Sequence, residues 1–127
     1  MRFSMKTFMI PCAPVLASIV CCSAFAHQTS KVATWRPTAE QVKEIEAQIT
    51  MPAGTTLTNY GRYYSGQFEH GHRQLMGVFV KGETKPGAYI VTPEKSPKIF
   101  DGGCSIVNFS YDMTTHKTLS IFCNGVG

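Results

Sequence analysis

One stretch decides the fold: residues 57–81 read LTNYGRYYSGQFEHGHRQLMGVFVK. Aromatic and β-branched residues recur on both sides of Glu69 to His72, a pattern typical of two β-strands joined by a hairpin turn. We expect these strands at Leu57 to Phe68 and at Arg73 to Lys81, with Phe68 opposite Arg73. The remaining elements are placed outward from this hairpin.

The pairing divides the side chains of the hairpin between two faces of a sheet, because alternate residues of a strand point to opposite sides. One face is mostly aliphatic and carries Tyr63, Met76, Val78 and Val80. The other face is aromatic and carries Tyr60, Arg62, Tyr64, Leu75 and Phe79.

A helix is expected before the hairpin. Thr38 follows Pro37, and Gln41 stands at the position that completes a capping box with Thr38. The helix runs for about twelve residues until Pro52 and Gly54, and its apolar stripe is Ala39, Val42, Ile45 and Ile49. We expect this stripe to cover the aliphatic face of the hairpin, which leaves the aromatic face without an evident cover.

Further strands are expected after the hairpin. They are Ala88 to Thr92, a short strand or loop near Lys98 to Phe100, and a second hairpin of Cys104 to Tyr111 with Lys117 to Asn124. The sequence therefore predicts an α+β fold. One N-terminal helix packs on a twisted antiparallel meander of about four to five strands, within a single domain at residues 37–127.

The first 26 residues read as a signal peptide. Arg2 and Lys6 precede a mostly apolar stretch, and the small residues around Ala26 are typical of a cleavage site. We expect cleavage after Ala26, export to the periplasm or beyond the cell, and a flexible N-terminal segment at residues 27–36. Two alternatives are a retained membrane anchor, which Pro11 and Pro14 disfavour, and lipid attachment at Cys21 or Cys22. No transmembrane segment is expected in the mature chain.

Two of the five cysteines, Cys104 and Cys123, remain after the expected cleavage. An even number of cysteines in an exported chain predicts a disulfide. The second hairpin agrees with this pairing, because Cys104 falls opposite Cys123 if Tyr111 pairs with His116.

Composition excludes two classes of protein. Residues 27–127 contain ten Lys and Arg against eight Asp and Glu, which is too even a balance for a nucleic-acid-binding protein. The chain is 43% hydrophobic, which argues against intrinsic disorder.

The uncovered aromatic face is the candidate binding site. Large aromatic side chains combined with arginine are typical of surfaces that bind a protein or a ligand. The expected partner is a protein of the cell envelope or a small ligand, and no cofactor is expected. The alternative is that the same side chains form a core or a homodimer contact. The candidate residues are Tyr60, Arg62, Tyr64, Phe79, Phe109, Tyr111 and His116.

Two other functions stay open. A small hydrolase or isomerase would use His116 as acid or base beside Arg62 in a shared pocket, although no catalytic nucleophile is identified. A copper-binding protein would use His27 as the new N-terminus, with His70, His72 or His116 as a second ligand.

Four short motifs resemble small exported proteins of Gram-negative bacteria to which no function is assigned. They are residues 60–64 (YGRYY), 77–80 (GVFV), 101–105 (DGGCS) and 123–125 (CNG). The resemblance covers about half the chain and implies export and paired cysteines. The order of the elements is also similar to cystatin-like and NTF2-like architectures. However, no cystatin-type inhibitory motif is present, and the chain lacks the helices that usually close an NTF2-like pocket.

Overall fold

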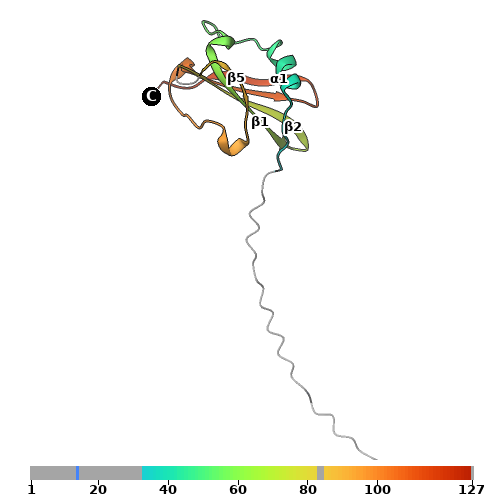
Figure 1. The fold of residues 1–127 in the computed structure, drawn as a ribbon. Coiled ribbons are helices and arrows are strands. Elements are labelled where there is room, and N and C mark those ends of the chain that lie inside the picture. Colours follow the sequence, from blue (N-terminus) through green and yellow to red (C-terminus); the bar gives the residue numbers. More distant parts are fainter. Residues whose placement is uncertain (1–13, 15–32, 83–84, 127) are drawn as a thin grey trace, which may run out of the picture.

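The computed structural model describes residues 14, 33–82 and 85–126. One α-helix, α1 (Ala39–Glu46), lies against a five-stranded sheet with the strand order β3-β1-β2-β4-β5 (Figure 1). The strands are β1 (Tyr60–Glu69), β2 (His72–Lys81), β3 (Gly87–Ile90), β4 (Ile106–Asp112) and β5 (Lys117–Cys123). The described part of the chain is therefore a mixed α/β domain.

The expected signal peptide and His27 lie outside the described residues, so export stays a prediction. Within the described ranges, no helix is long and apolar enough to cross a membrane.

The capping box at the start of α1 is confirmed. The hydroxyl of Thr38 accepts a hydrogen bond from the backbone N–H of Gln41 at 3.2 Å, and the amide oxygen of Gln41 accepts from the N–H of Thr38 at 2.9 Å. The helix is eight residues long, shorter than predicted. It ends early because the chain tightens after Glu46, where the N–H of Gln48 donates to the carbonyl of Ile45 at 2.9 Å.

The first hairpin forms in the predicted register. Phe68 pairs with Arg73 between β1 and β2. The turn residues His70 and Gly71 both have positive φ, of 49° and 77°, which suits a two-residue hairpin turn. The division of the hairpin into an aromatic and an aliphatic face therefore holds.

The expected antiparallel meander is wrong at β3. This strand lies on the far side of β1 from β2 and pairs with β1 in parallel, from Gly61 opposite Gly87 to Tyr64 opposite Ile90. A crossover segment, residues 91–105, then leads to β4 on the other side of β2. The expected short strand near Lys98 to Phe100 is a loop within this crossover. The alternation of apolar and polar residues in a sequence identifies a strand, but it does not show which other strand lies beside it in the sheet.

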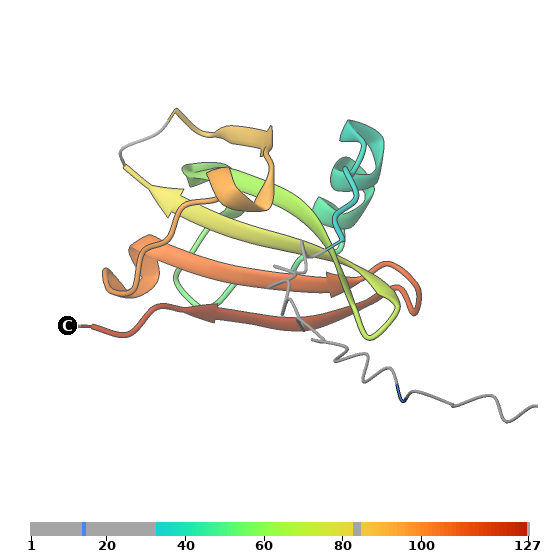
Figure 2. The same ribbon diagram turned by 90° about the horizontal axis from the view of Figure 1, so that it is seen from below.

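The helix covers the aromatic face, so the prediction that it covers the aliphatic face is wrong. In Figure 1, α1 lies above the strands and the crossover segment (orange) lies below them. Figure 2 shows α1 and the β4–β5 turn at the same end of the sheet. The buried core consists of Val42, Ile45, Tyr60, Tyr64, Leu75, Phe79, Val107, Phe109 and Tyr111.

Two glycines make room on the aromatic face for this cover. Trp35 lies over Gly66 and donates its indole N–H to the carbonyl of Gln67 at 3.0 Å. A Cβ atom at Gly66 would stand 2.2 Å from the carbonyl oxygen of Trp35. At Gly77 a Cβ atom would stand 2.8 Å from the ring of Phe79. Because neither glycine has a side chain, the large rings and the helix fit on the same face.

The predicted disulfide is confirmed, although the predicted register of the second hairpin is wrong. Cys104 and Cys123 are bonded, with a Cα–Cα distance of 4.6 Å. Cys123 pairs with Val107 rather than lying opposite Cys104, which belongs to a 3₁₀ turn before β4. The register differs for two reasons. His116 has a φ of 55° and belongs to the turn instead of β5, and the pairing shifts by one further residue between Ser110 and Tyr111.

The two edges of the sheet differ. The β3 edge is four residues long and follows Lys85 and Pro86. The β5 edge is seven residues long, and its side chains Leu119 and Phe122 are 50% and 54% exposed.

Replacing Gly66 with alanine tests the contact with Trp35. We expect Gly66→Ala to lower the free energy of unfolding by roughly 1–3 kcal/mol, because the new methyl group must displace the backbone of Trp35. Urea unfolding monitored by tryptophan fluorescence measures this loss. Gly125→Ala is the matched control, since no atom lies within 4 Å of its added Cβ atom. Equal effects of the two substitutions would contradict the proposed role of Gly66.

Candidate functional site

The structure buries six of the seven predicted site residues. Only His116 is exposed among them. The other six, which are Tyr60, Arg62, Tyr64, Phe79, Phe109 and Tyr111, are between 0% and 8% exposed. The premise of an uncovered aromatic face is therefore wrong, because α1 and Trp35 cover it.

Arg62 is bound within the protein by a carboxylate. Its Nε donates to Glu46 Oε1 at 2.6 Å and its Nη2 donates to Oε2 at 3.2 Å. The hydroxyl of Tyr64 donates to the same Oε1 at 2.8 Å. The remaining guanidinium nitrogen donates to the carbonyls of Tyr60 and Leu57, at 3.1 Å and 3.4 Å. This Glu46–Arg62–Tyr64 network leaves no guanidinium nitrogen without an acceptor.

The network is structural. Burial and the negative charge of Glu46 together raise the pKa of the Tyr64 phenol, so Tyr64 stays a neutral donor. Glu46, the last residue of α1, was missing from the predicted site. The sequence did contain a signal, because Glu46 follows Val42 by four residues and so lies beside the apolar stripe of the helix.

Removing the arginine tests whether the network stabilises the fold. We expect Arg62→Ala to lower the free energy of unfolding by about 3–5 kcal/mol, because it removes two of the three hydrogen bonds to the Glu46 carboxylate together with its counterion. Chemical unfolding of the variant and of Lys98→Ala, an exposed site, provides the comparison. An arginine variant as stable as the lysine variant would show that Arg62 is dispensable for folding.

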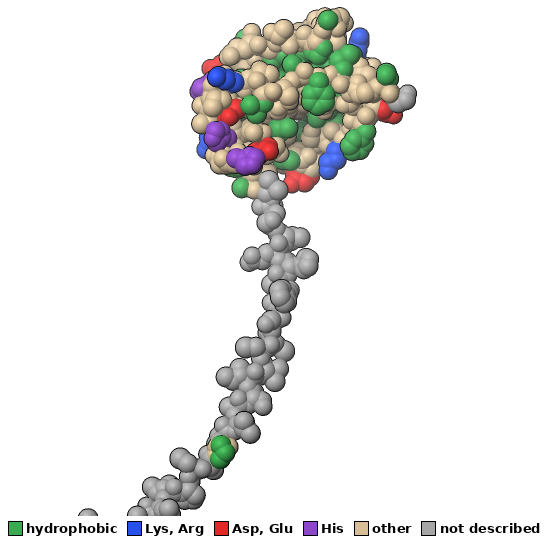
Figure 3. Space-filling view, turned by 180° about the vertical axis from the view of Figure 1, so that it is seen from behind, with side chains coloured by type: hydrophobic (Ala, Val, Ile, Leu, Met, Phe, Trp, Pro, Cys, Tyr) green, Lys and Arg blue, Asp and Glu red, His purple; other side chains and the backbone are tan. Residues whose placement is uncertain are grey.

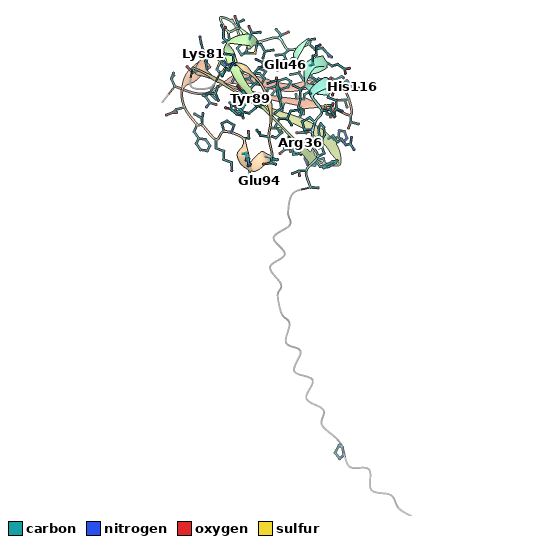
Figure 4. The ribbon with its side chains drawn as sticks, in the orientation of Figure 1. Arg36, Glu46, Lys81, Tyr89, Glu94 and His116 are labelled. Carbon is teal, nitrogen blue, oxygen red and sulfur yellow. A yellow bond between two sulfur atoms is a disulfide. The ribbon has the colours of Figure 1, made fainter. Side chains whose placement is uncertain are left out.

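Tyr111 and His116 meet at a groove between α1 and the β4–β5 turn. Figure 4 places His116 beside the helix that carries Glu46. The groove has a volume of about 150 Å³. It is lined by Gln41, Glu44, Ile45, Gln48, Tyr111, Met113 and His116.

The helix side of the groove is set by helical spacing. Gln41, Glu44, Ile45 and Gln48 follow one another at intervals that keep them on one side of α1 and its last turn. The amide oxygen of Gln41 is held by the capping box. The amide nitrogen of Gln48 donates to the carbonyl of Glu44 at 3.3 Å, which fixes Gln48 at the rim.

The opposite side of the groove is held by Asp112. Its carboxylate accepts from the backbone N–H groups of Thr114 and Thr115, at 2.8 Å and 3.2 Å, and so shapes the turn that carries His116. Nδ1 of His72 donates to the other carboxylate oxygen at 2.9 Å. The hydrogen bond from His72, followed by the two backbone bonds, lowers the pKa of Asp112 to about 2 against the opposing effect of burial.

Three tyrosines belong to the described core, and Tyr111 is the one whose hydroxyl has no hydrogen-bond partner there. The residue is 3% exposed, and its hydroxyl makes no hydrogen bond within the described part of the chain. By contrast, the hydroxyl of Tyr60 donates to the carbonyl of Cys104 at 2.5 Å, and that of Tyr64 donates to Glu46. Because no fully enclosed polar side-chain atom of the described residues lacks a partner, the Tyr111 hydroxyl reaches solvent, and Tyr111 is one of the residues that line the groove.

The residues expected for a copper site and for a catalytic pair are not brought together among the described residues. Figure 3 shows histidine side chains gathered at one end of the molecule. His70 is exposed in the hairpin turn, His72 is bound to Asp112, and His27 lies outside the described residues. Among the residues with described positions, no three His, Cys, Asp or Glu lie close enough to hold a metal ion. Arg62 does not line the groove of His116, so the catalytic pair expected for an enzyme is not brought together there.

Two further hollows lie elsewhere on the described part of the chain. One, of about 320 Å³, is lined by Lys81, Gly102 and Tyr60, and the Tyr60 hydroxyl there is bound to Cys104. The other, of about 230 Å³, is lined by Trp35 and Arg36, which donate to backbone carbonyls of the sheet. The groove between α1 and the β4–β5 turn contains two of the predicted site residues, Tyr111 and His116, so it is the strongest candidate site among these three.

The chain matches no protein-family model, no curated protein and no solved structure. The functional argument therefore depends on the geometry of the groove.

Acid should weaken the turn that positions His116. The pKa of Asp112 is lower in the folded protein than the ordinary value of about 3.9. The stability that its carboxylate contributes is therefore present above pH about 4 and is lost as the pH falls toward 2. We expect Asp112→Asn to be less stable than the wild type at pH 7, with a difference that shrinks across this window. Urea unfolding at several pH values measures it, with exposed Asp101→Asn as the control. A difference that stays constant from pH 7 to 2 would refute the assignment.

Proposed function

We propose that this chain is an exported, non-catalytic binding module that holds one protruding group of a cell-envelope partner in the groove between α1 and the β4–β5 turn. The observation that carries the proposal is Tyr111, a buried residue that lines this groove and whose hydroxyl has no hydrogen-bond partner among the described residues. A polar group that the fold leaves without a partner is available to a ligand. The disulfide between Cys104 and Cys123 is compatible with an oxidising compartment, as the expected signal peptide requires.

The size of the groove favours a small group over a whole cofactor. Pockets for drug-sized ligands and cofactors measure about 300–1,000 Å³. The groove of about 150 Å³ corresponds to roughly five water molecules. It therefore suits a single side chain that projects from a partner, in the way that a hot-spot residue enters a pocket at an interface.

The lining of the groove favours binding over catalysis. Ile45 and Met113 supply apolar contact area, while Glu44, Tyr111 and the glutamines supply polar groups. No serine, cysteine or lysine lines the groove to act as a nucleophile. Within the described part of the chain, His116 has no carboxylate bound to it, so it lacks the group that orients a catalytic imidazole. These features support recognition without covalent chemistry.

Removing the Tyr111 hydroxyl tests the proposal without disturbing the core. We expect Tyr111→Phe to keep the melting temperature of the wild type, because the hydroxyl has no partner in the fold. We expect its affinity for the partner to fall about two- to tenfold, which is the effect of losing one hydrogen bond. The immobilised, oxidised protein is exposed to envelope extract, captured proteins are identified by mass spectrometry, and the affinity of each is measured with purified material.

The matched control is Tyr89→Phe. The Tyr89 hydroxyl donates to the carbonyl of Lys85 on the surface, far from the groove in sequence and sheet position. A partner bound equally by the wild type and by both variants would contradict the use of the groove. Selective weakening by Tyr111→Phe, with Tyr89→Phe unchanged, is the expected result.

A further inference from the structure

We infer that the group held in the groove is a cation, namely the alkylammonium or guanidinium group of a lysine or arginine side chain of the partner. This inference depends on the proposed function of the groove and names the chemistry that the groove selects. It follows from the charge, the free acceptor atoms and the apolar contacts of the lining residues.

The formal charge of the groove is negative. Glu44 is the one lining residue with a formal charge at neutral pH when histidine is neutral. Glu44 also lies in the last turn of α1, where the carbonyl ends of the helix carry a partial negative charge. Both effects attract a cation and repel an anion. Lys117 follows His116 in the sequence but does not line the groove.

The groove offers several free hydrogen-bond acceptors, beside the amide nitrogen of Gln41, which is a free donor. The Glu44 carboxylate makes no hydrogen bond within the described residues, so both of its oxygens are free. Gln48 uses its amide nitrogen on the Glu44 carbonyl, which leaves its amide oxygen as the available group. The Tyr111 hydroxyl oxygen is the fourth acceptor atom. An ammonium group offers three donors and a guanidinium group offers five, so either can bond several of these oxygens at once.

The apolar contacts favour a cation on a hydrocarbon stem over a metal ion. The stem of a lysine or arginine lies along apolar surface while its charged end meets polar groups, and Ile45 and Met113 provide that surface. A volume of about 150 Å³ is sufficient for such a stem and its charged end. A divalent ion would need more acidic ligands than the single carboxylate of Glu44.

The test measures binding of short peptides to the oxidised protein recovered after expression of the full chain. The probes are acetyl-Ala-Lys-Ala-amide, acetyl-Ala-Arg-Ala-amide, the matching Glu peptide and free n-butylammonium chloride. Amide chemical shifts in ¹H–¹⁵N NMR spectra report both the affinity and the location. We expect the Lys and Arg peptides to bind with dissociation constants on the order of millimolar, as a single side chain allows, and to shift the resonances of Glu44, Tyr111 and His116.

Two variants test whether the charge of Glu44 is responsible for binding the Lys and Arg peptides. Glu44→Gln preserves size and removes the charge of an exposed residue, so we expect an unchanged melting temperature and at least tenfold weaker binding of the Lys and Arg peptides. Glu40→Gln removes a charge from the same helix outside the groove and should leave binding unchanged.

The remaining outcomes overturn the inference. Binding of the Glu peptide at the groove, or Lys binding that survives Glu44→Gln, would show that charge does not select the ligand. Binding of n-butylammonium without binding of the peptides would identify a free amine in place of a partner side chain. A partner whose binding requires Tyr111 but not Glu44 would also contradict the inference that the bound group is a cation. The proposed function would still stand in that case. If no partner depends on Tyr111, the proposed function itself fails.

Discussion

The rest of the structure depends on one carboxylate, that of Glu46. It accepts two hydrogen bonds from the buried guanidinium of Arg62 and one from the hydroxyl of Tyr64. A guanidinium enclosed without a counterion would cost several kcal/mol, so Arg62 can lie under the helix only if Glu46 lies above it. The network thereby fixes both the face of the sheet that α1 covers and the point along β1 where the helix ends.

The fixed helix end also creates the groove. With Glu46 held against β1, the side of α1 that carries Glu44 faces the β4–β5 turn. A row of aromatic rings joins the two sites, from Tyr64 through Phe79 and Phe109 to Tyr111, with centroid distances of 5.6, 5.9 and 6.3 Å. The first ring donates its hydroxyl to Glu46, and the last ring presents its hydroxyl at the groove. The buried network and the candidate site are thus opposite ends of one packed row.

Sequence reasoning predicted the features that depend on neighbours in the chain. The capping box of Thr38, the first hairpin and the pairing of Cys104 with Cys123 follow from local patterns, and the structure contains all three. Three other features were missed. The face covered by the helix and the parallel partner of β3 depend on distant contacts, whereas the register of the second hairpin depends on which residues form its turn. In the candidate site, Tyr111 and His116 were identified, whereas Glu44 was not, because it becomes part of a groove only through the placement of the β4–β5 turn beside the helix.

The unequal edges of the sheet limit how copies of this domain can associate through strand pairing. At β3 the edge is four residues long and follows Pro86, which has no N–H to donate. At β5 seven residues offer unpaired backbone groups along the other edge. A polymer formed by strand pairing needs two open sheet edges on every subunit. Of the two edges of the described sheet, only β5 is long enough to pair along seven residues. Among the described strands, pairing between copies through β5 alone would therefore close at a two-fold dimer.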